Sequence, residues 1–124
     1  MISFEKGMYL RTKDGKIAKF IKYDEEDKEQ LITDYYQYST IWVGDITSYS
    51  FNIVDLIQVG DYINGYCVTE IFGNNRKKNP STLIYCGYEI DNRFYYIGFY
   101  NEQIETIITK EQILQMQYKI SLEG

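Results

Sequence analysis

The chain has no histidine, one proline and two cysteines among its 124 residues. Without histidine there can be no Ser/His or Cys/His dyad, and both the commonest metal ligand and the usual acid–base catalyst of neutral pH are missing. Two cysteines alone cannot complete a four-ligand zinc site of the common type. A single proline excludes collagen-like and proline-rich sequences. The sequence therefore predicts a protein that is not an enzyme and that uses no metal or cofactor.

Basic residues and long apolar runs are also scarce. The chain has 13 Lys and Arg against 18 Asp and Glu, a net charge of −5 that repels the phosphate backbone and argues against nucleic acid as the partner. No stretch reaches the roughly 18 apolar residues that span a bilayer. Residues 1–6 lack the apolar core of a signal peptide. We expect a cytoplasmic protein with two free thiols and no membrane partner.

Aromatic residues, in contrast, are abundant. They make up 17% of the chain, with 14 Tyr and 6 Phe, and residues of this type favour half-buried strands over helices. Apolar residues account for 44%, which is enough for a core in a chain of this length. The sequence shows no internal repeat and no linker between two parts. We therefore expect a single β-rich domain over residues 1–124.

Three dipeptides are typical of tight turns between strands. Asp14-Gly15 and Asn64-Gly65 match the two-residue hairpin signal, because both positions tolerate a positive φ. Asp91-Asn92 is expected to form a third such turn, and Asn52 to cap a short helical turn. The expected strands cover residues 8–12, 16–23, 31–38, 40–43, 59–63, 66–72, the two halves of 82–100, 104–108 and 118–121.

One short helix is expected near the C-terminal end. Thr109-Lys110-Glu111-Gln112 matches a capping box, in which Thr109 is the N-cap and Gln112 reaches back to it. The helix would run over about 110–117, with Ile113 and Met116 on one side. The predicted fold class is mainly β, as a small SH3-like barrel or a strongly curled antiparallel sheet with this one C-terminal helix.

The hairpin over residues 82–100 has a register that the sequence itself specifies. If Asp91 and Asn92 form the turn, Ile90 lies opposite Arg93. The opposite face then places Gly87 against Tyr96 and Gly98 against Tyr85, and each tyrosine can cover the exposed backbone of its glycine. The apolar face of this hairpin is expected to contain Ile84, Cys86, Tyr88, Tyr95, Ile97 and Phe99.

Candidate binding residues fall into an aromatic group and two charged groups. Tyr85, Tyr96 and Tyr100 could stack on a base, although a packed face or a subunit interface is equally rich in tyrosine. Apart from these groups, Asp55 and Asp61 flank Gly60 and could lie close as a carboxylate pair, but each is equally typical of a turn cap. The charged groups, both also typical of solvated loops, are the acidic run Asp24, Glu25, Glu26, Asp27 and the basic triplet Arg76, Lys77, Lys78.

Several segments carry a family resemblance. They are the opening YLRTKDGK at 9–16, NIVDLIQVGDYINGY at 52–66, IITKEQ at 107–112 and YKI at 118–120. With these motifs the chain resembles a family of small uncharacterised proteins encoded in phages, prophages and mobile elements of low-GC Gram-positive bacteria. Residues 73–100 depart from that pattern, so a function specific to this chain is expected there.

The resemblance implies an accessory protein that acts in the cytoplasm of a host cell. Our leading hypothesis is a non-enzymatic, anti-CRISPR-like inhibitor of bacterial defence, which binds a protein target such as a CRISPR nuclease. The alternative is an oligomeric sponge for a cyclic nucleotide immune signal, with Tyr85 or Tyr96 on the base and Arg76 or Lys78 on the phosphate. A third hypothesis is a nucleic-acid-binding barrel.

Overall fold

The computed structural model describes residues 3–36, 39–72 and 83–116. The protein is mainly β, with two antiparallel five-stranded sheets and one short helix, α1 (Lys110–Met116). The described strands form two separate open sheets and do not close into one barrel, so the SH3-like barrel is not confirmed. Residues 117–121, which include the expected last strand and the expected last residue of the helix, lie outside the described residues.

The N-terminal sheet has the strand order β4-β3-β2-β1-β5 and the C-terminal sheet the order β10-β6-β7-β8-β9. The first sheet contains β1 (Tyr9–Thr12), β2 (Ile17–Tyr23), β3 (Gln30–Thr33), β4 (Thr40–Trp42) and β5 (Ile46–Ser50). The second contains β6 (Tyr62–Ile63), β7 (Tyr66–Phe72), β8 (Leu83–Ile90), β9 (Arg93–Phe99) and β10 (Ile107–Ile108). The 3₁₀ helices are η1 (Val43–Asp45), η2 (Ile53–Leu56) and η3 (Asn101–Gln103).

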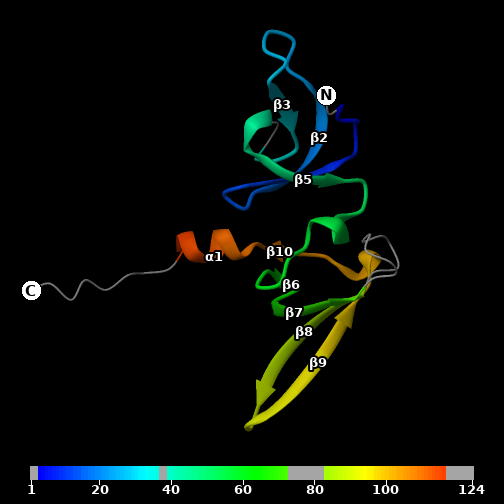
Figure 1. Ribbon diagram of the computed structural model, residues 1–124, viewed down its shortest axis with the longest axis vertical. Coiled ribbons are helices and arrows are strands. Elements are labelled where there is room, and N and C mark those ends of the chain that lie inside the picture. The colour runs from blue at the N-terminus through cyan, green and yellow to red at the C-terminus, as the bar shows by residue number, and fades with distance from the viewer. Residues whose placement is uncertain (1–2, 37–38, 73–82, 117–124) are drawn as a thin grey trace, which may run out of the picture.

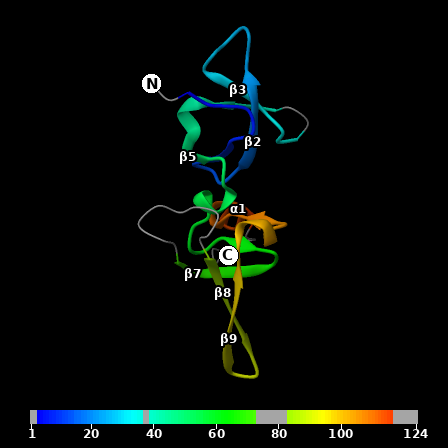
Figure 2. The same cartoon turned by 90° about the vertical axis from the view of Figure 1, so that its right-hand side faces the viewer.

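The two sheets lie end to end, and each has its own core. Figures 1 and 2 show the N-terminal sheet above the C-terminal sheet, with the β8–β9 hairpin projecting at the far end. Apolar side chains therefore gather in two places rather than one. The N-terminal core contains Phe4, Leu10, Phe20 and Leu31. The C-terminal core contains Val54, Ile57, Ile63, Val68, Ile84, Cys86 and Phe99.

Two of the three predicted hairpin turns are confirmed. Asn64 and Gly65 both have positive φ, as do Asp91 and Asn92, which is the backbone that a two-residue turn requires. At Asp14-Gly15 the predicted hairpin between β1 and β2 is present, but the predicted two-residue turn is wrong, because only Gly15 of this pair has a positive φ. The backbone N–H of Gly15 donates to the C=O of Thr12, and the N–H of Thr12 to the C=O of Lys16. This is a three-residue loop rather than a two-residue one.

The predicted register of the β8–β9 hairpin is confirmed along its whole length. Ile90 pairs with Arg93, Gly87 with Tyr96 and Gly98 with Tyr85. Because the turn is tight and symmetric, it fixes which residues lie opposite each other, and alternation then places the apolar set on one face. Ile84, Cys86 and Phe99 of that set are buried in the C-terminal core.

The ends of several strands differ from those expected. The strand expected over 31–38 ends at Thr33 and that over 104–108 covers only Ile107–Ile108, while β5 was not predicted. The helical turn after Asn52 is present as η2, but Asn52 makes no side-chain cap bond. The capping box of α1 is confirmed, since Thr109 N–H donates to Gln112 Oε1 at 3.0 Å and Gln112 N–H to Thr109 Oγ1 at 3.3 Å.

Candidate functional site

Four aromatic rings lie on the side of the C-terminal sheet that faces away from its core. We call Phe72, Tyr85, Phe94 and Tyr96 the aromatic face. They point outwards because alternate residues of the same strands, such as Ile84 and Cys86, point inwards. Their exposure is large for apolar rings, at 52% for Phe72, 61% for Phe94 and 59% for Tyr96.

The rings of the aromatic face pair with each other and border an open hollow. Phe72 meets Tyr85 edge-on at 5.2 Å between centroids, and Phe94 lies 5.8 Å from Tyr96 in a tilted arrangement. Glu70, Phe72, Tyr85 and Tyr96 line a hollow of about 390 Å³. Two predicted site residues, Tyr85 and Tyr96, are therefore brought together, and Glu70 adds a negative charge that the sequence did not single out.

The space beside the two hairpin glycines is filled by the chain itself. A Cβ on Gly98 would lie 3.1 Å from Leu83 Cδ1 and 3.3 Å from the Tyr85 ring, so Tyr85 covers this glycine, as predicted, together with Leu83. At Gly87, however, the nearest ring is that of Phe94, 2.7 Å from a built Cβ, and not that of Tyr96. The prediction for this second glycine is wrong, because the diagonal neighbour rather than the directly opposite residue covers it. Any ligand must therefore bind over the rings rather than beside the glycines.

Tyr100 and the charged candidates lie elsewhere. Tyr100 follows β9, is 42% exposed and does not line the hollow. The acidic run lies between β2 and β3, at the end of the molecule opposite the β8–β9 hairpin (Figure 1). Asp24 Oδ1 accepts the backbone N–H of Glu26 at 2.8 Å, so part of this run stabilises its own turn. Arg76, Lys77 and Lys78 lie outside the described residues.

A buried ion cluster joins the two sheets. It consists of Arg11 from β1, Asp61 from the turn before β6 and Glu111 from α1. Arg11 Nη2 donates to Asp61 Oδ1 at 2.9 Å and to Glu111 Oε2 at 2.8 Å. The side chains of Arg11 and Asp61 are 1% and 0% exposed, whereas that of Glu111 is 25% exposed. These contacts tie the N-terminal sheet to both the C-terminal sheet and the helix.

The charges of the ion cluster are compensated by hydrogen bonds as well as by each other. Arg11 Nη1 also donates to the C=O of Leu56 at 2.8 Å, and Asp61 accepts the backbone N–H groups of Gln58 at 2.7 Å and Lys110 at 2.9 Å. Burial disfavours the charged guanidinium, but the hydrogen bonds and charges of Asp61 and Glu111 outweigh it and raise the pKa of Arg11. The turn-cap role considered for Asp61 is confirmed, although its partner Arg11 was not foreseen.

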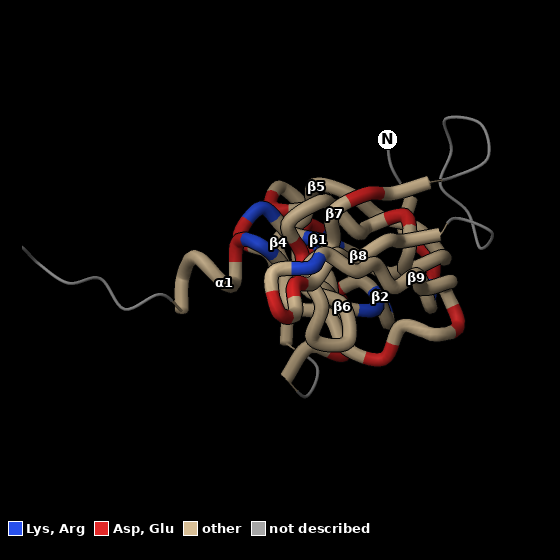
Figure 3. The backbone as a smooth tube through the Cα atoms, turned by 90° about the horizontal axis from the view of Figure 1, so that it is seen from below, with Lys and Arg blue, Asp and Glu red and all other residues tan. Residues whose placement is uncertain are grey.

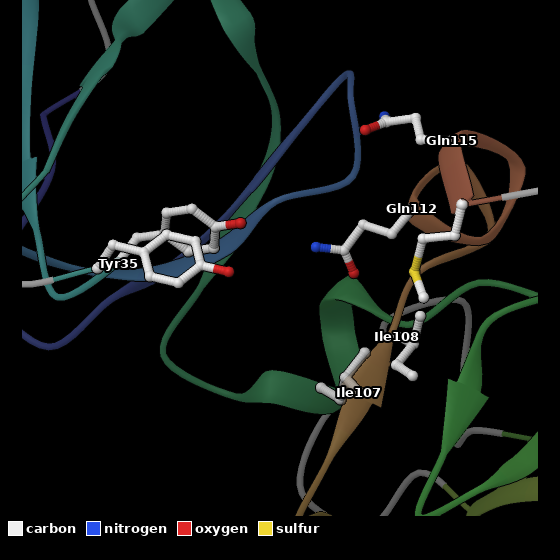
Figure 4. Close-up of a pocket in the computed structure, with 7 residues that line it drawn as sticks. Tyr35, Ile107, Ile108, Gln112 and Gln115 are labelled. Carbon is white, nitrogen blue, oxygen red and sulfur yellow. The ribbon is translucent and has the colours of Figure 1, made fainter.

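A second hollow lies between the two sheets and the helix. Tyr35, Tyr36, Ile107, Ile108, Gln112, Gln115 and Met116 line its volume of about 360 Å³. Figure 4 shows Tyr35 on one side of this hollow and Gln112, Ile107 and Ile108 on the other. Among the described residues, its lining includes no ionisable group apart from the two tyrosines, so these residues offer a ligand hydrogen bonds from amides and hydroxyls but no opposite charge.

The buried cysteine is expected to be chemically inert. The pKa of the Cys86 thiol is raised to about 11, mainly by burial and to a smaller extent by the nearby Cys67. Almost no thiolate is therefore present at about pH 8. In a Cys67→Ser variant we expect no reaction with a thiol reagent until denaturant unfolds the protein. The Cys86→Ala variant, which keeps the half-buried Cys67, is the matched control. Rapid labelling of Cys86 in the folded protein would contradict the packing described here.

The described residues contain no group of three or more Cys, Asp or Glu placed to hold a metal ion. Within the same residues, no helix has the length and apolar character needed to cross a membrane. No protein-family model matches the chain, and neither the curated proteins nor the solved structures contain one with significant similarity to it.

Proposed function

We propose that this chain is a non-enzymatic binding protein that recognises a protein partner through the aromatic face. The observation that carries the proposal is the joint exposure of Phe72 on β7 with Phe94 and Tyr96 on β9, all on one side of the C-terminal sheet. Large aromatic side chains are enriched at the centres of protein interfaces, where they contribute most of the binding energy. Burying these rings removes a large apolar area from water, which favours association.

Several features favour a protein over a nucleotide or a nucleic acid. Glu70 lines the hollow, and its carboxylate would repel a phosphate there. The Phe72 and Tyr85 rings are almost perpendicular, at 85°, so these two rings do not form a parallel slot for a flat base. Figure 3 shows acidic residues, in red, on several elements of the described chain, and negative charge of this kind disfavours a phosphate backbone. The cyclic nucleotide sponge and the nucleic-acid-binding barrel are therefore less well supported than a protein ligand.

The class of partner comes from the family resemblance. Accessory proteins of phages and mobile elements often bind and disable a component of their host, and the aromatic face lies largely in the segment 73–100 that departs from the family pattern. We therefore propose a bacterial defence protein, such as a CRISPR nuclease, as the target in the host cytoplasm. Binding by contact alone would inhibit it, since this proposal assigns the chain no reaction.

A double variant tests the proposal. We expect Phe94→Ser with Tyr96→Ser to weaken binding to a purified defence effector by about 30-fold or more, the loss typical of two interface anchors worth at least about 2 kcal/mol together. Binding is measured by calorimetry, with effectors chosen by affinity capture on the native chain. Both positions are exposed on the edge strand, so the fold should be retained, which circular dichroism verifies.

The matched control is Tyr36→Ser, which removes an aromatic ring that is 80% exposed near the N-terminal sheet. Its affinity for the effector should equal that of the native chain. Equal binding by all three proteins would show that the aromatic face is not the interface. Failure of every tested defence effector to bind the native chain would remove the support for this class of target.

A further inference from the structure

The outer edge of β9 has no partner strand among the described residues. β9 is the last strand in the order β10-β6-β7-β8-β9, and its pairing with β8 is continuous from Arg93 to Phe99 without a bulge. Natural proteins protect such edges with lysine, proline, bulges or very short strands. β9 has seven residues with none of these features, and Arg93 at its first position is its only charged residue. An unprotected edge of this length is suited to pairing with another strand.

The turn determines which backbone groups of β9 are free. In a two-residue hairpin the residues that flank the turn, here Ile90 and Arg93, form a hydrogen-bonded pair. Alternate residues of β9 starting from Arg93 therefore direct their N–H and C=O groups towards β8. The residues between them direct these groups outwards, away from the sheet. The outward-directed residues are Phe94, Tyr96 and Gly98.

We infer that two copies of this chain pair through their β9 strands, antiparallel and about a two-fold axis at Tyr96. This register pairs Phe94 with Gly98 of the second copy and Tyr96 with its own equivalent, so every outward-directed residue has a hydrogen-bonding partner. A shift by two residues leaves one outward-directed residue of each strand without a partner inside β9. The register also sets the Phe94 ring beside a glycine, as it already lies beside Gly87 within the monomer.

The charges near β9 are compatible with pairing between two copies, despite the net charge of −5 on each chain. The two Arg93 side chains would lie six residues apart along the strand, or about 20 Å, well beyond the screening length at physiological salt. Each Arg93 would lie opposite Phe99 of the other copy, three residues before its exposed Glu102. Each Arg93 is thus placed at the end of the other β9 that is nearer to its one exposed carboxylate in η3, Glu102. The other charged residues of the hairpin, Glu89 and Asp91, lie on β8 and in the turn rather than on β9.

The pairing produces one ten-stranded sheet from two C-terminal sheets. Because the two-fold axis is perpendicular to the sheet, both aromatic faces lie on the same side and join at Tyr96. The hairpin projects away from the N-terminal sheet in both views, which leaves its edge accessible to a second copy (Figures 1 and 2). This inference goes beyond the proposed function, since it uses the edge of the sheet and leaves the rings available to a partner.

The first test is the mass in solution of the native chain and of two variants at one position. Native protein should have twice the 14.8 kDa of one chain by light scattering at high concentration, and should dissociate on dilution. Tyr96→Pro removes an outward N–H that the monomer does not use, and should be monomeric throughout. Tyr96→Thr removes the same ring but keeps the N–H and suits a strand, so it should still dimerise.

The second test needs no variant and covers the case in which Tyr96→Pro fails to fold. Amide hydrogen exchange at Phe94, Tyr96 and Gly98 should slow at least tenfold between dilute and concentrated native protein, whereas exchange at Tyr95 and Ile97 should stay slow at both. A native chain that is monomeric at millimolar concentration would overturn the inference. Loss of the dimer in both Tyr96→Thr and Tyr96→Pro would also overturn it. So would a native dimer in which the amides of Phe94, Tyr96 and Gly98 exchange as fast as in the monomer.

Discussion

Replacing Asp61 by alanine is expected to destabilise the protein by about 3–5 kcal/mol, because it leaves the buried charge of Arg11 without its main partner. The change also removes the acceptor of two backbone N–H groups, those of Gln58 and Lys110. Domains of this kind have total stabilities of about 5–15 kcal/mol, so the loss is a large share of the whole. Urea denaturation followed by far-UV circular dichroism measures it.

The matched control is Asp45→Ala, which breaks an ion pair on the surface. Lys13 Nζ lies 3.2 Å from Asp45 Oδ1, with the two side chains 63% and 39% exposed, and water screens such a pair strongly. We expect a much smaller loss of stability from this variant. If Asp61→Ala does not fold, Glu111→Gln gives a milder change in the same cluster, since Glu111 is partly exposed. Equal stabilities for Asp61→Ala and Asp45→Ala would contradict the role given to the ion cluster.

The Asp61→Ala variant also tests how the unfolding of the two sheets is coupled. Trp42 is the only tryptophan and lies in β4, so its fluorescence reports on the N-terminal sheet alone, whereas circular dichroism reports on both sheets. In the native protein the ion cluster should make the two unfolding curves coincide. Without Asp61 the two cores lose their main polar connection, and we expect the curves to separate.

The features that the sequence predicted correctly are local. The register of β8 and β9 follows from a two-residue turn, because Asp91 and Asn92 both adopt the positive φ that such a turn needs. The capping box at Thr109 and Gln112 is likewise confined to one helical turn. At Asp14-Gly15 the side chain of Thr12 stabilises a three-residue loop in place of the predicted two-residue turn. Thr12 donates a hydrogen bond to Asp14, which together with smaller contributions lowers the pKa of that carboxyl, and Thr12 also accepts the N–H of Lys16.

The features that the sequence did not predict depend on contacts between distant residues. Arg11 is 50 residues from Asp61 and 100 from Glu111, and no spacing rule connects positions so far apart. In the sequence Arg11 resembles the exposed lysines around it. Of the candidate site, Tyr85 and Tyr96 were found from strand alternation. Phe94 was not singled out because it lies opposite Glu89 rather than a glycine, and Phe72 because it lies on β7, beyond the hairpin that fixes the register. That the described strands form no closed barrel has the same cause, since barrel closure depends on which strands meet at the edges.

Replacing Gly15 by alanine is expected to displace helix α1 and to cost about 2–5 kcal/mol, from backbone strain and overpacking together. Gly15 has φ +89°, and a Cβ there would lie 2.2 Å from Thr109 Oγ1 and 2.8 Å from Glu111 Cβ. Thr109 Oγ1 also donates to the C=O of Gly15 at 2.7 Å, so the clash falls on the contact that holds the helix to the β1–β2 loop. Urea denaturation measures the loss of stability.

Gly65→Ala separates the two causes of that loss. Gly65 has almost the same φ, +88°, but a Cβ there would meet nothing within 4 Å, so this variant carries the backbone strain of about 1–2 kcal/mol without the clash. The excess loss in Gly15→Ala then measures the docking of α1. Exchange of the Ile113 amide, which donates to the C=O of Thr109 within the first turn of α1, should accelerate in Gly15→Ala and not in Gly65→Ala. Equal losses in the two variants, with Ile113 equally protected, would mean that the docking of α1 on the β1–β2 loop adds little to the stability of the fold.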